Sequence, residues 1–325
     1  MNIFYVGDIE SPFIKLDVKM LEDAGNTVTL LTPPSTLSRC PHYLVDFIDS
    51  IPPIIKSDLI WIWFADIHAV PVILLAKLYH KPVIVFCGDY ELTNCPEMNY
   101  GNQRLKIRGA VTRWVLRNAD EIIVPSDPYV DVVKKVEPKM TSCGEPFMFE
   151  GFQYCSKSPS LQVSVVPWCI DVSEFDGNCI KENVVSTAYF SESARVRKGI
   201  DVFMNAVDLD SYLVFVLNRV PRASYIETIK KTRVYCQLTY PPTESFGVSL
   251  LEAMYNYCVP VVTNCAALEW VAGGTGIVVP YGDADATRKA IATAMNMDGT
   301  AAHNRACEFS YDRRMTALKN VLQKY

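Results

Sequence analysis

The stretch 239–262, TYPPTESFGVSLLEAMYNYCVPVV, carries more information about the fold than any other part of the 325-residue chain. It follows a strand-like apolar run at 234–238 and ends in a second one at 259–263. This order predicts a strand, a loop, a helix from about Phe246 to Tyr257, and another strand. A helix that opens at a glycine-containing loop presents unpaired N–H groups and a partial positive charge. The stretch therefore predicts a site for an anionic ligand where the helix begins.

Two carboxylates, Glu244 and Glu252, stand eight positions apart in this stretch. Eight helical residues span roughly 12 Å, whereas glycoside hydrolysis needs carboxyl groups about 5 Å or about 6.5–9.5 Å apart. The spacing favours holding the two ends of an elongated ligand such as a nucleotide-sugar. In the alternative reading, Glu244 complements the helix dipole and Glu252 is a solvated helix residue. The spacing alone leaves both readings open.

Strands alternate with helices along nearly the whole chain. Apolar runs predict strands at 3–6, 27–31, 59–63, 83–86 and 121–124, and again at 184–190, 213–216, 234–238, 261–263 and 277–279. The alternation stops around 138–160, where Pro, Ser, Lys and Gly accumulate and mark a boundary. We therefore expect an α/β protein with two Rossmann-like, doubly wound parallel-sheet domains, at 1–160 and 161–310, which face each other across a cleft.

Composition excludes several classes of protein. Half of the residues are hydrophobic and the net charge is −5, so nucleic acid is not expected as a partner. The chain begins with a strand-like run and not a signal peptide, and the apolar window 59–75 is broken by Asp66, His68 and Pro71, so we expect a cytoplasmic protein. None of the eleven cysteines forms a C-x2-C pair, which argues against structural zinc, although the sequence leaves disulfides open.

Metal motifs in the chain have structural explanations. Asp208-Leu-Asp210 and Asp283-Ala-Asp285 have the form of Asp-x-Asp motifs, but both fit the boundaries of helices or strands. The four histidines show no ligand spacing, and His68 reads as a core or helix-start residue. We therefore expect no bound metal.

Further blocks resemble a known family when they are taken together with Glu244-x7-Glu252. They are GNTVTLLT at 25–32, ADEIIVPS at 119–126, VVPWCIDVSEF at 165–175 and RKGID at 197–201. In this order they resemble glycosyltransferase family 4, the retaining GT-B transferases of the glycogen synthase-like superfamily. The resemblance runs from residue 1 to about 310, and only the paired-glutamate block is specific by itself.

The resemblance implies a GT-B fold in which the last helix, 311–325, returns to the first domain. The implied activity is retaining transfer of a hexosyl group from a UDP- or GDP-sugar to a glycan, lipid-linked or other acceptor. The implied chemistry uses no cofactor and no catalytic metal.

The resemblance also assigns roles to residues. Glu252 would hold the ribose hydroxyls and Glu244 the donor sugar, while Lys198 would neutralise the departing diphosphate. The implied donor-binding set also contains Ser245, Phe246, Gly247, Val248 and Ser249, with Gly7 after the first strand and Asp89 after the fourth.

The chain departs from the family pattern at two places. The family's Gly-Arg pair is missing from 190–198, where Arg195, with Arg197 behind it, is the expected substitute. The family's histidine near the donor sugar is missing from 87–89, where Asp89 is either a ligand contact or a turn residue. These departures keep open the alternative of a catalytically silent nucleotide-sugar-binding protein. A separate alternative is a different GT-B enzyme such as a phosphorylase or epimerase.

One basic segment stands out in an acidic chain. Residues 104–117 contain five cations, no acid and Trp114. The segment fits peripheral contact with anionic lipid headgroups, which would bring a lipid-linked acceptor close. The alternative is an ordinary solvated helix face.

Overall fold

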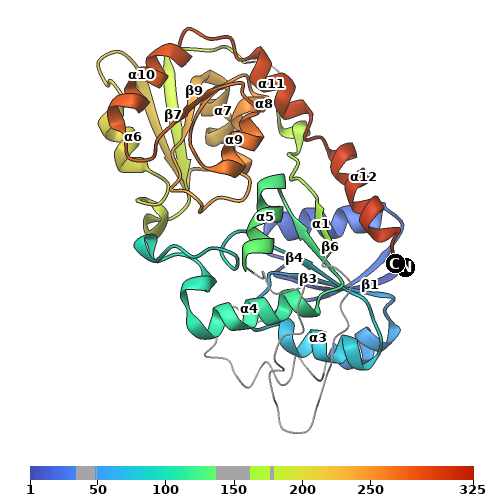
Figure 1. The fold of residues 1–325 in the computed structure, drawn as a ribbon. Helices are drawn as coiled ribbons and strands as arrows, with labels where there is room; N and C mark the ends of the chain where they lie inside the picture. The colour runs from blue at the N-terminus through green and yellow to red at the C-terminus, as the bar shows by residue number, and fades with distance from the viewer. Residues whose placement is uncertain (34–47, 49, 137–161, 176–178) are drawn as a thin grey trace.

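The computed structural model describes residues 1–33, 48, 50–136, 162–175 and 179–325, and it contains two parallel β-sheets (Figure 1). Each sheet is built from strands that alternate with helices along the chain. This arrangement confirms the expected fold class of two Rossmann-like units.

The first sheet has six strands in the order β2-β1-β3-β4-β5-β6. Its strands are β1 Asn2–Val6, β2 Thr27–Leu31, β3 Leu59–Trp63, β4 Val83–Phe86, β5 Glu121–Val124 and β6 Gln162–Val165. The helices among them are α1 Pro12–Asp23, α3 Ala69–Leu78, α4 Lys106–Asn118 and α5 Asp127–Val136. Every residue of β3, β4 and β5 is buried, which explains why these strands read as continuous apolar runs and not as an alternating pattern.

The second sheet has five strands in the order β11-β10-β9-β7-β8. Its strands are β7 Val184–Tyr189, β8 Leu213–Asn218, β9 Thr232–Gln237, β10 Val259–Thr263 and β11 Ile277–Val279. The helices of this part are α6 Ile200–Ala206, α7 Arg222–Lys231, α8 Val248–Tyr255, α9 Ala266–Ala272, α10 Ala284–Ala294 and α11 Thr300–Cys307. The chain ends with α12, Tyr311–Leu322.

One strand of the first sheet, β6, was not predicted from the sequence. Residues 162–165 follow the expected boundary at 160, yet β6 pairs in parallel with β5 at the edge of the first sheet. The first sheet therefore extends past residue 160. The reason is that Gln162–Val165 is only partly buried and mixes polar with apolar residues, so it lacks the apolar run that identifies the other strands.

Helix α12 packs against the first sheet, away from the strands that precede it in the chain (Figure 1). Its residue Arg314 forms a fully buried ion pair with Asp17 of α1 and donates to the carbonyl oxygens of Val166, at 3.0 Å, and Pro167, at 2.6 Å. The Arg314 guanidinium also lies 4.1 Å from the centre of the Trp168 ring. Arg314 thus joins the last helix both to the connection between the sheets and to the buried carboxylate of α1.

The residues expected to be structural have structural roles. Asp283 caps α10 by accepting from the backbone of Ala286, and Asp208 accepts from the backbone of Asp210. His68 stands at the start of α3, where its Nε2 lies 2.8 Å from the Trp63 carbonyl oxygen. Within the described part of the chain, no group of three His, Cys, Asp or Glu side chains has the geometry of a metal site. No described helix is both long enough and apolar enough to cross a bilayer.

Candidate functional site

The paired-glutamate stretch forms the loop after β9 and the helix α8. Gly247 caps the helix with a φ of 93°, a left-handed conformation, and a Cβ at this position would lie 2.7 Å from the Leu268 side chain. In any α-helix the first N–H groups have no intrahelical acceptor. The amides of Val248 and Ser249 are therefore available to a ligand at the start of α8, two residues later than the expected start at Phe246.

A second loop brings Lys198 to this helix start. It follows β7 and ends at Gly199, which has a φ of 67° and caps α6. A Cβ on Gly199 would lie 2.1 Å from the Leu238 carbonyl oxygen, so the two loops approach as closely as only glycine allows. As a result, the Lys198 ammonium forms an ion pair with Glu244 Oε2, and the two side chains are 19% and 13% exposed.

Glu244 is held by a small polar network. Gln237, the last residue of β9, donates to Glu244 Oε2 at 3.0 Å, and Ser249 donates to Gln237 Oε1 at 3.2 Å. Burial raises the pKa of Glu244, but the nearby Lys198 and Arg197 charges and the Gln237 bond outweigh it and lower the pKa below its usual value. Glu244 is therefore a carboxylate at neutral pH, able to accept hydrogen bonds from sugar hydroxyls.

The loop after β4 in the first sheet reaches the same place. Asp89 is half-buried and faces Tyr100, Arg197, Lys198 and Glu244. Burial and the Glu244 charge raise the pKa of Asp89. The Arg197 guanidinium lies 4.2 Å from the centre of the Tyr100 ring and donates to the Thr243 carbonyl oxygen at 2.7 Å. The site is thus built from both sheets.

Further contacts join the two sheets through the glutamate loop. Ser126, which follows β5, donates to the Ser245 carbonyl oxygen at 2.7 Å, and the Tyr129 hydroxyl donates to the Pro242 carbonyl oxygen at 3.0 Å. Phe246 is fully buried and its ring lies 5.3 Å from the Phe309 ring. Its side chain is therefore a packing residue, and only its backbone can face a ligand.

Glu252 lies on α8 and has hydrogen-bond partners other than those of Glu244. Its Oε1 accepts from Arg222 at 2.7 Å, and the same guanidinium is paired with Glu174. The Glu252 side chain is 12% exposed. Glu252 is therefore a nearly buried carboxylate held by one arginine, in contrast with the reading of it as a solvated helix residue.

The structure separates the two candidate arginines. Arg195 donates to Asp201 from Nε at 3.0 Å and from a terminal nitrogen at 2.8 Å, at the surface. Arg197, and not Arg195, contributes to the electrostatic surroundings of Glu244 and Asp89. Gly7 follows β1, where a Cβ would lie 3.0 Å from Ile14 of α1 and 3.1 Å from Tyr5 of β1, so packing between this helix and strand accounts for the glycine.

For the transfer from a nucleotide-sugar that the family resemblance implies, we expect Arg197→Met to lower kcat/KM about 10- to 100-fold, the effect of losing one charged hydrogen bond. Arg195→Met should change it less than about threefold, because exposed ion pairs contribute little. Steady-state release of nucleoside diphosphate measures both variants. A larger loss of kcat/KM in Arg195→Met than in Arg197→Met would show that Arg195 takes the place of the arginine in the family's Gly-Arg pair.

The loop that carries Asp89 also contains a buried acid, Glu91. Its Oε1 accepts from the Gly88 backbone at 2.8 Å, whereas Oε2 is enclosed without a partner among the described residues. Burial, together with the Asp89 and Asp66 charges, raises the pKa of Glu91 to about 8. Glu91 is therefore protonated in the folded protein at neutral pH.

Glu91 gives a pH-dependent stability. Between about pH 4.5 and about pH 8 the folded chain keeps a proton that the unfolded chain loses, so the free energy of unfolding falls as the pH rises across this window. In Glu91→Gln the free energy of unfolding should not show this fall. Relative to the wild type, the free energy of unfolding of the variant should therefore rise by on the order of 1–3 kcal/mol when the pH is raised from 5 to 8. Urea unfolding at both pH values measures the difference. Parallel pH profiles would refute a protonated Glu91.

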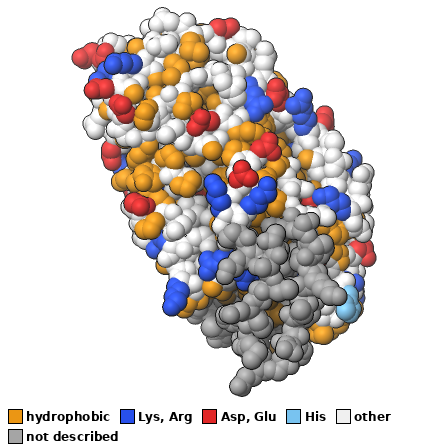
Figure 2. Space-filling model, in the orientation of Figure 1, with side chains coloured by type: hydrophobic (Ala, Val, Ile, Leu, Met, Phe, Trp, Pro, Cys, Tyr) orange, Lys and Arg blue, Asp and Glu red, His pale blue; other side chains and the backbone are white. Residues whose placement is uncertain are grey.

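The basic segment is only partly available to a partner. Arg108 lies 3.9 Å from Asp66, and Arg113 donates to Gln103 at 2.8 Å. Ile107, in contrast, is 76% exposed. On the face shown in Figure 2, Lys and Arg side chains are spread over both halves of the view. Membrane contact through this segment stays a prediction.

Sequence reasoning missed three contributors to the site, Gln237, Tyr100 and Arg222. Gln237 had a signal, because it is a polar residue at the carboxyl end of a buried strand. Tyr100 and Arg222 had none, since each comes from a loop or helix whose position depends on the packed fold.

Comparisons with known proteins agree with this architecture. Residues 212–309, which include both glutamates, match the family model described as "Glycosyl transferases group 1". A comparison with curated protein sequences found no match.

Solved structures share the whole fold at low identity. Sucrose-phosphate synthase from Thermosynechococcus elongatus has a TM-score of 0.69 and 14% identity, over 100% of this chain and 98% of that one. HepE from Anabaena, in complex with UDP and glucose, has a TM-score of 0.70 and 12% identity, over 100% of both chains. An α,α-trehalose-phosphate synthase (UDP-forming) from Burkholderia vietnamiensis has a TM-score of 0.66 and 10% identity, over 99% and 96%. The chain thus has the two-domain GT-B fold.

Proposed function

We propose that the protein is a retaining glycosyltransferase of the family 4 type, which transfers a hexosyl group from a nucleotide-diphosphate sugar. The observation that carries the proposal is the nearly buried Lys198–Glu244 ion pair beside the free amides at the start of α8. This arrangement offers a cation and N–H donors to a diphosphate and a carboxylate to a sugar. The group 1 match over 212–309 supports it.

In the proposed reaction, the bond between the anomeric carbon and a phosphate oxygen breaks, and that oxygen keeps the electron pair. Lys198 and the amides of Val248 and Ser249 stabilise the negative charge that develops on the leaving diphosphate. The acceptor hydroxyl forms the new bond on the same face of the sugar and passes its proton to the departing phosphate. Because these groups supply the positive charge, the proposed chemistry uses no metal ion.

The remaining residues of the proposed site position the donor. Glu244 and the backbone of Phe246 and Gly247 hold the sugar hydroxyls. Glu252 holds the ribose: Arg222 occupies its Oε1, and Oε2 is the atom proposed to accept from the ribose hydroxyls. Asp89 lies on the loop after β4 of the first sheet and interacts electrostatically with Glu244. From this position it is proposed to contact the donor or the acceptor.

The proposed donor is a UDP-sugar in preference to a GDP-sugar. HepE was solved with UDP-glucose as well as with UDP and glucose, and the trehalose-phosphate synthase is described as UDP-forming. The acceptor is a glycan or a lipid-linked glycan, and the second of these would use the exposed part of residues 104–117 at a membrane surface.

Thermal unfolding with UDP, GDP and ADP tests the donor assignment. A nucleotide at 100 times its Kd adds about 2.7 kcal/mol of stability, which raises the Tm by several degrees. We expect UDP to give the largest shift, and we expect UDP-glucose to be turned over in the presence of EDTA. A UDP shift without turnover of any UDP-sugar would favour a silent binding protein instead.

A further inference from the structure

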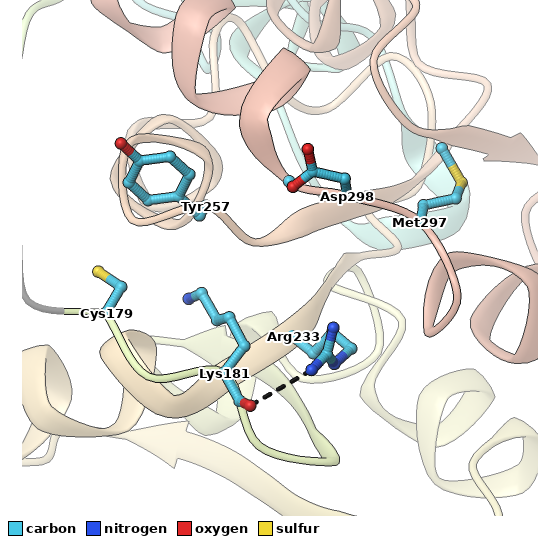
Figure 3. Close-up of a pocket in the computed structure, with 7 residues that line it drawn as sticks. Cys179, Lys181, Arg233, Tyr257, Met297 and Asp298 are labelled. Atoms are coloured by element: carbon cyan, nitrogen blue, oxygen red, sulfur yellow. Dashed lines mark hydrogen bonds between the residues drawn. The ribbon is translucent and has the colours of Figure 1, made fainter.

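A separate cavity of about 300 Å³ lies at the opposite end of the second sheet from the glutamates (Figure 3). Arg233, at the beginning of β9, lines it, whereas Gln237 at the end of the same strand bonds to Glu244. Four strand residues span roughly 13 Å. The cavity is therefore distinct from the proposed donor site.

Two cations line one side of the cavity, and their hydrogen-bonding capacity is not used up. Lys181 donates to the Ile229 carbonyl oxygen at 3.1 Å and to Cys258 Sγ at 3.4 Å, so one of the three ammonium donors remains. Arg233 donates to the Lys181 carbonyl oxygen at 3.3 Å. Its Nε is enclosed without a hydrogen-bond partner among the described residues.

The other side of the cavity carries an acceptor. Figure 3 shows Tyr257, Met297 and Asp298 facing Lys181 and Arg233 across the cavity. One oxygen of Asp298 accepts from the Thr300 backbone at 3.2 Å. The cavity thus separates a positive side from a single negative acceptor.

We propose that this cavity binds a small phosphate monoester that also carries hydroxyl groups. An enclosed arginine N–H group without an acceptor incurs a desolvation cost, which an anionic ligand beside the guanidinium offsets. A phosphate monoester is close to a dianion at neutral pH, which matches the charges of Arg233 and Lys181. The Asp298 carboxylate accepts a hydrogen bond from a hydroxyl of the same ligand, which selects a hydroxylated ester over inorganic phosphate.

Calorimetric titration of the full chain with glycerol 3-phosphate tests the proposal, with and without saturating UDP. We expect one binding site whose Kd does not change with UDP, and weaker binding of inorganic phosphate. Arg233→Gln should raise the Kd about tenfold or more, because it removes a charged hydrogen-bond donor. Arg288→Gln is the matched control, since Arg288 is exposed on α10 and paired with Asp285; it should leave the Kd unchanged.

Asp298→Asn provides a second, independent variant. It should weaken glycerol 3-phosphate but leave inorganic phosphate as tight as before or tighter, because the removed charge repels the anion. No saturable binding to the wild type would overturn the proposal, as would competition by UDP or an unchanged Kd in Arg233→Gln. If Asp298→Asn weakened the binding of glycerol 3-phosphate and inorganic phosphate equally, Asp298 would not be the acceptor for a ligand hydroxyl.

Discussion

Lys198→Met is expected to lower the turnover number for glycosyl transfer about 10²–10³-fold, the usual effect of removing one group that stabilises developing negative charge. Lys198 is nearly buried against Glu244 at the start of α8, where a low local dielectric strengthens its interaction with a diphosphate. The interaction grows as the bond to the sugar breaks, so kcat should fall more than donor affinity. Release of UDP from UDP-glucose under saturating donor measures kcat.

Lys134→Met is the control for this variant. Lys134 also pairs with a carboxylate, Asp131, at 3.5 Å, but its side chain is 64% exposed on α5. Its replacement should change kcat less than about twofold, because surface pairs contribute little. A Lys198→Met enzyme as active as Lys134→Met would exclude Lys198 from the reaction.

Arg314→Met is expected to lower the free energy of unfolding by about 3–5 kcal/mol, the loss seen when one partner of a buried ion pair is removed. The variant leaves Asp17 charged inside the first unit, where its remaining donors among the described residues are the Tyr5 hydroxyl at 3.5 Å and the Trp63 ring N–H at 3.0 Å. It also releases the backbone of Val166 and Pro167 from α12. Urea unfolding measures the loss.

Two further variants make this result specific. Arg313→Met changes the preceding residue of the same helix, which is exposed. It should lower the free energy of unfolding by less than about 1 kcal/mol. Asp17→Leu combined with Arg314→Met should recover part of the loss, because no buried charge then lacks a partner. A loss in Arg314→Met no larger than in Arg313→Met would show that α12 is not fixed by this pair.

The strands that are fully buried could be predicted from the sequence, whereas the partly buried edge strand β6 could not. Strands such as Leu59–Trp63 and Val83–Phe86 are buried on both faces, so each one is a continuous apolar run with clear ends. Gln162–Val165, which pairs with β5, is an edge strand that is only partly buried. Its four residues mix polar and apolar side chains and do not form an apolar run. For this reason the sequence did not indicate that the first sheet extends past residue 160.

The site was predictable as far as local sequence determines it. The glycine-containing loop before Val248 indicated the helix start, because this depends on short-range turn geometry, whereas Lys198 was indicated by the family resemblance at 197–201. The contact between Arg197 and Tyr100 joins loops of different sheets, 97 positions apart. Such contacts require the packed fold, so the sequence favoured Arg195, which the structure pairs with Asp201.

The central claim is that Glu244 takes part in glycosyl transfer from a bound nucleotide-sugar. The most direct test compares UDP release from UDP-glucose, and binding of UDP, in the wild type and in Glu244→Gln. The account predicts turnover by the wild type, a loss of about 10²-fold or more in the variant, and a Kd for UDP that stays within a few fold. Equal turnover in both proteins would contradict it.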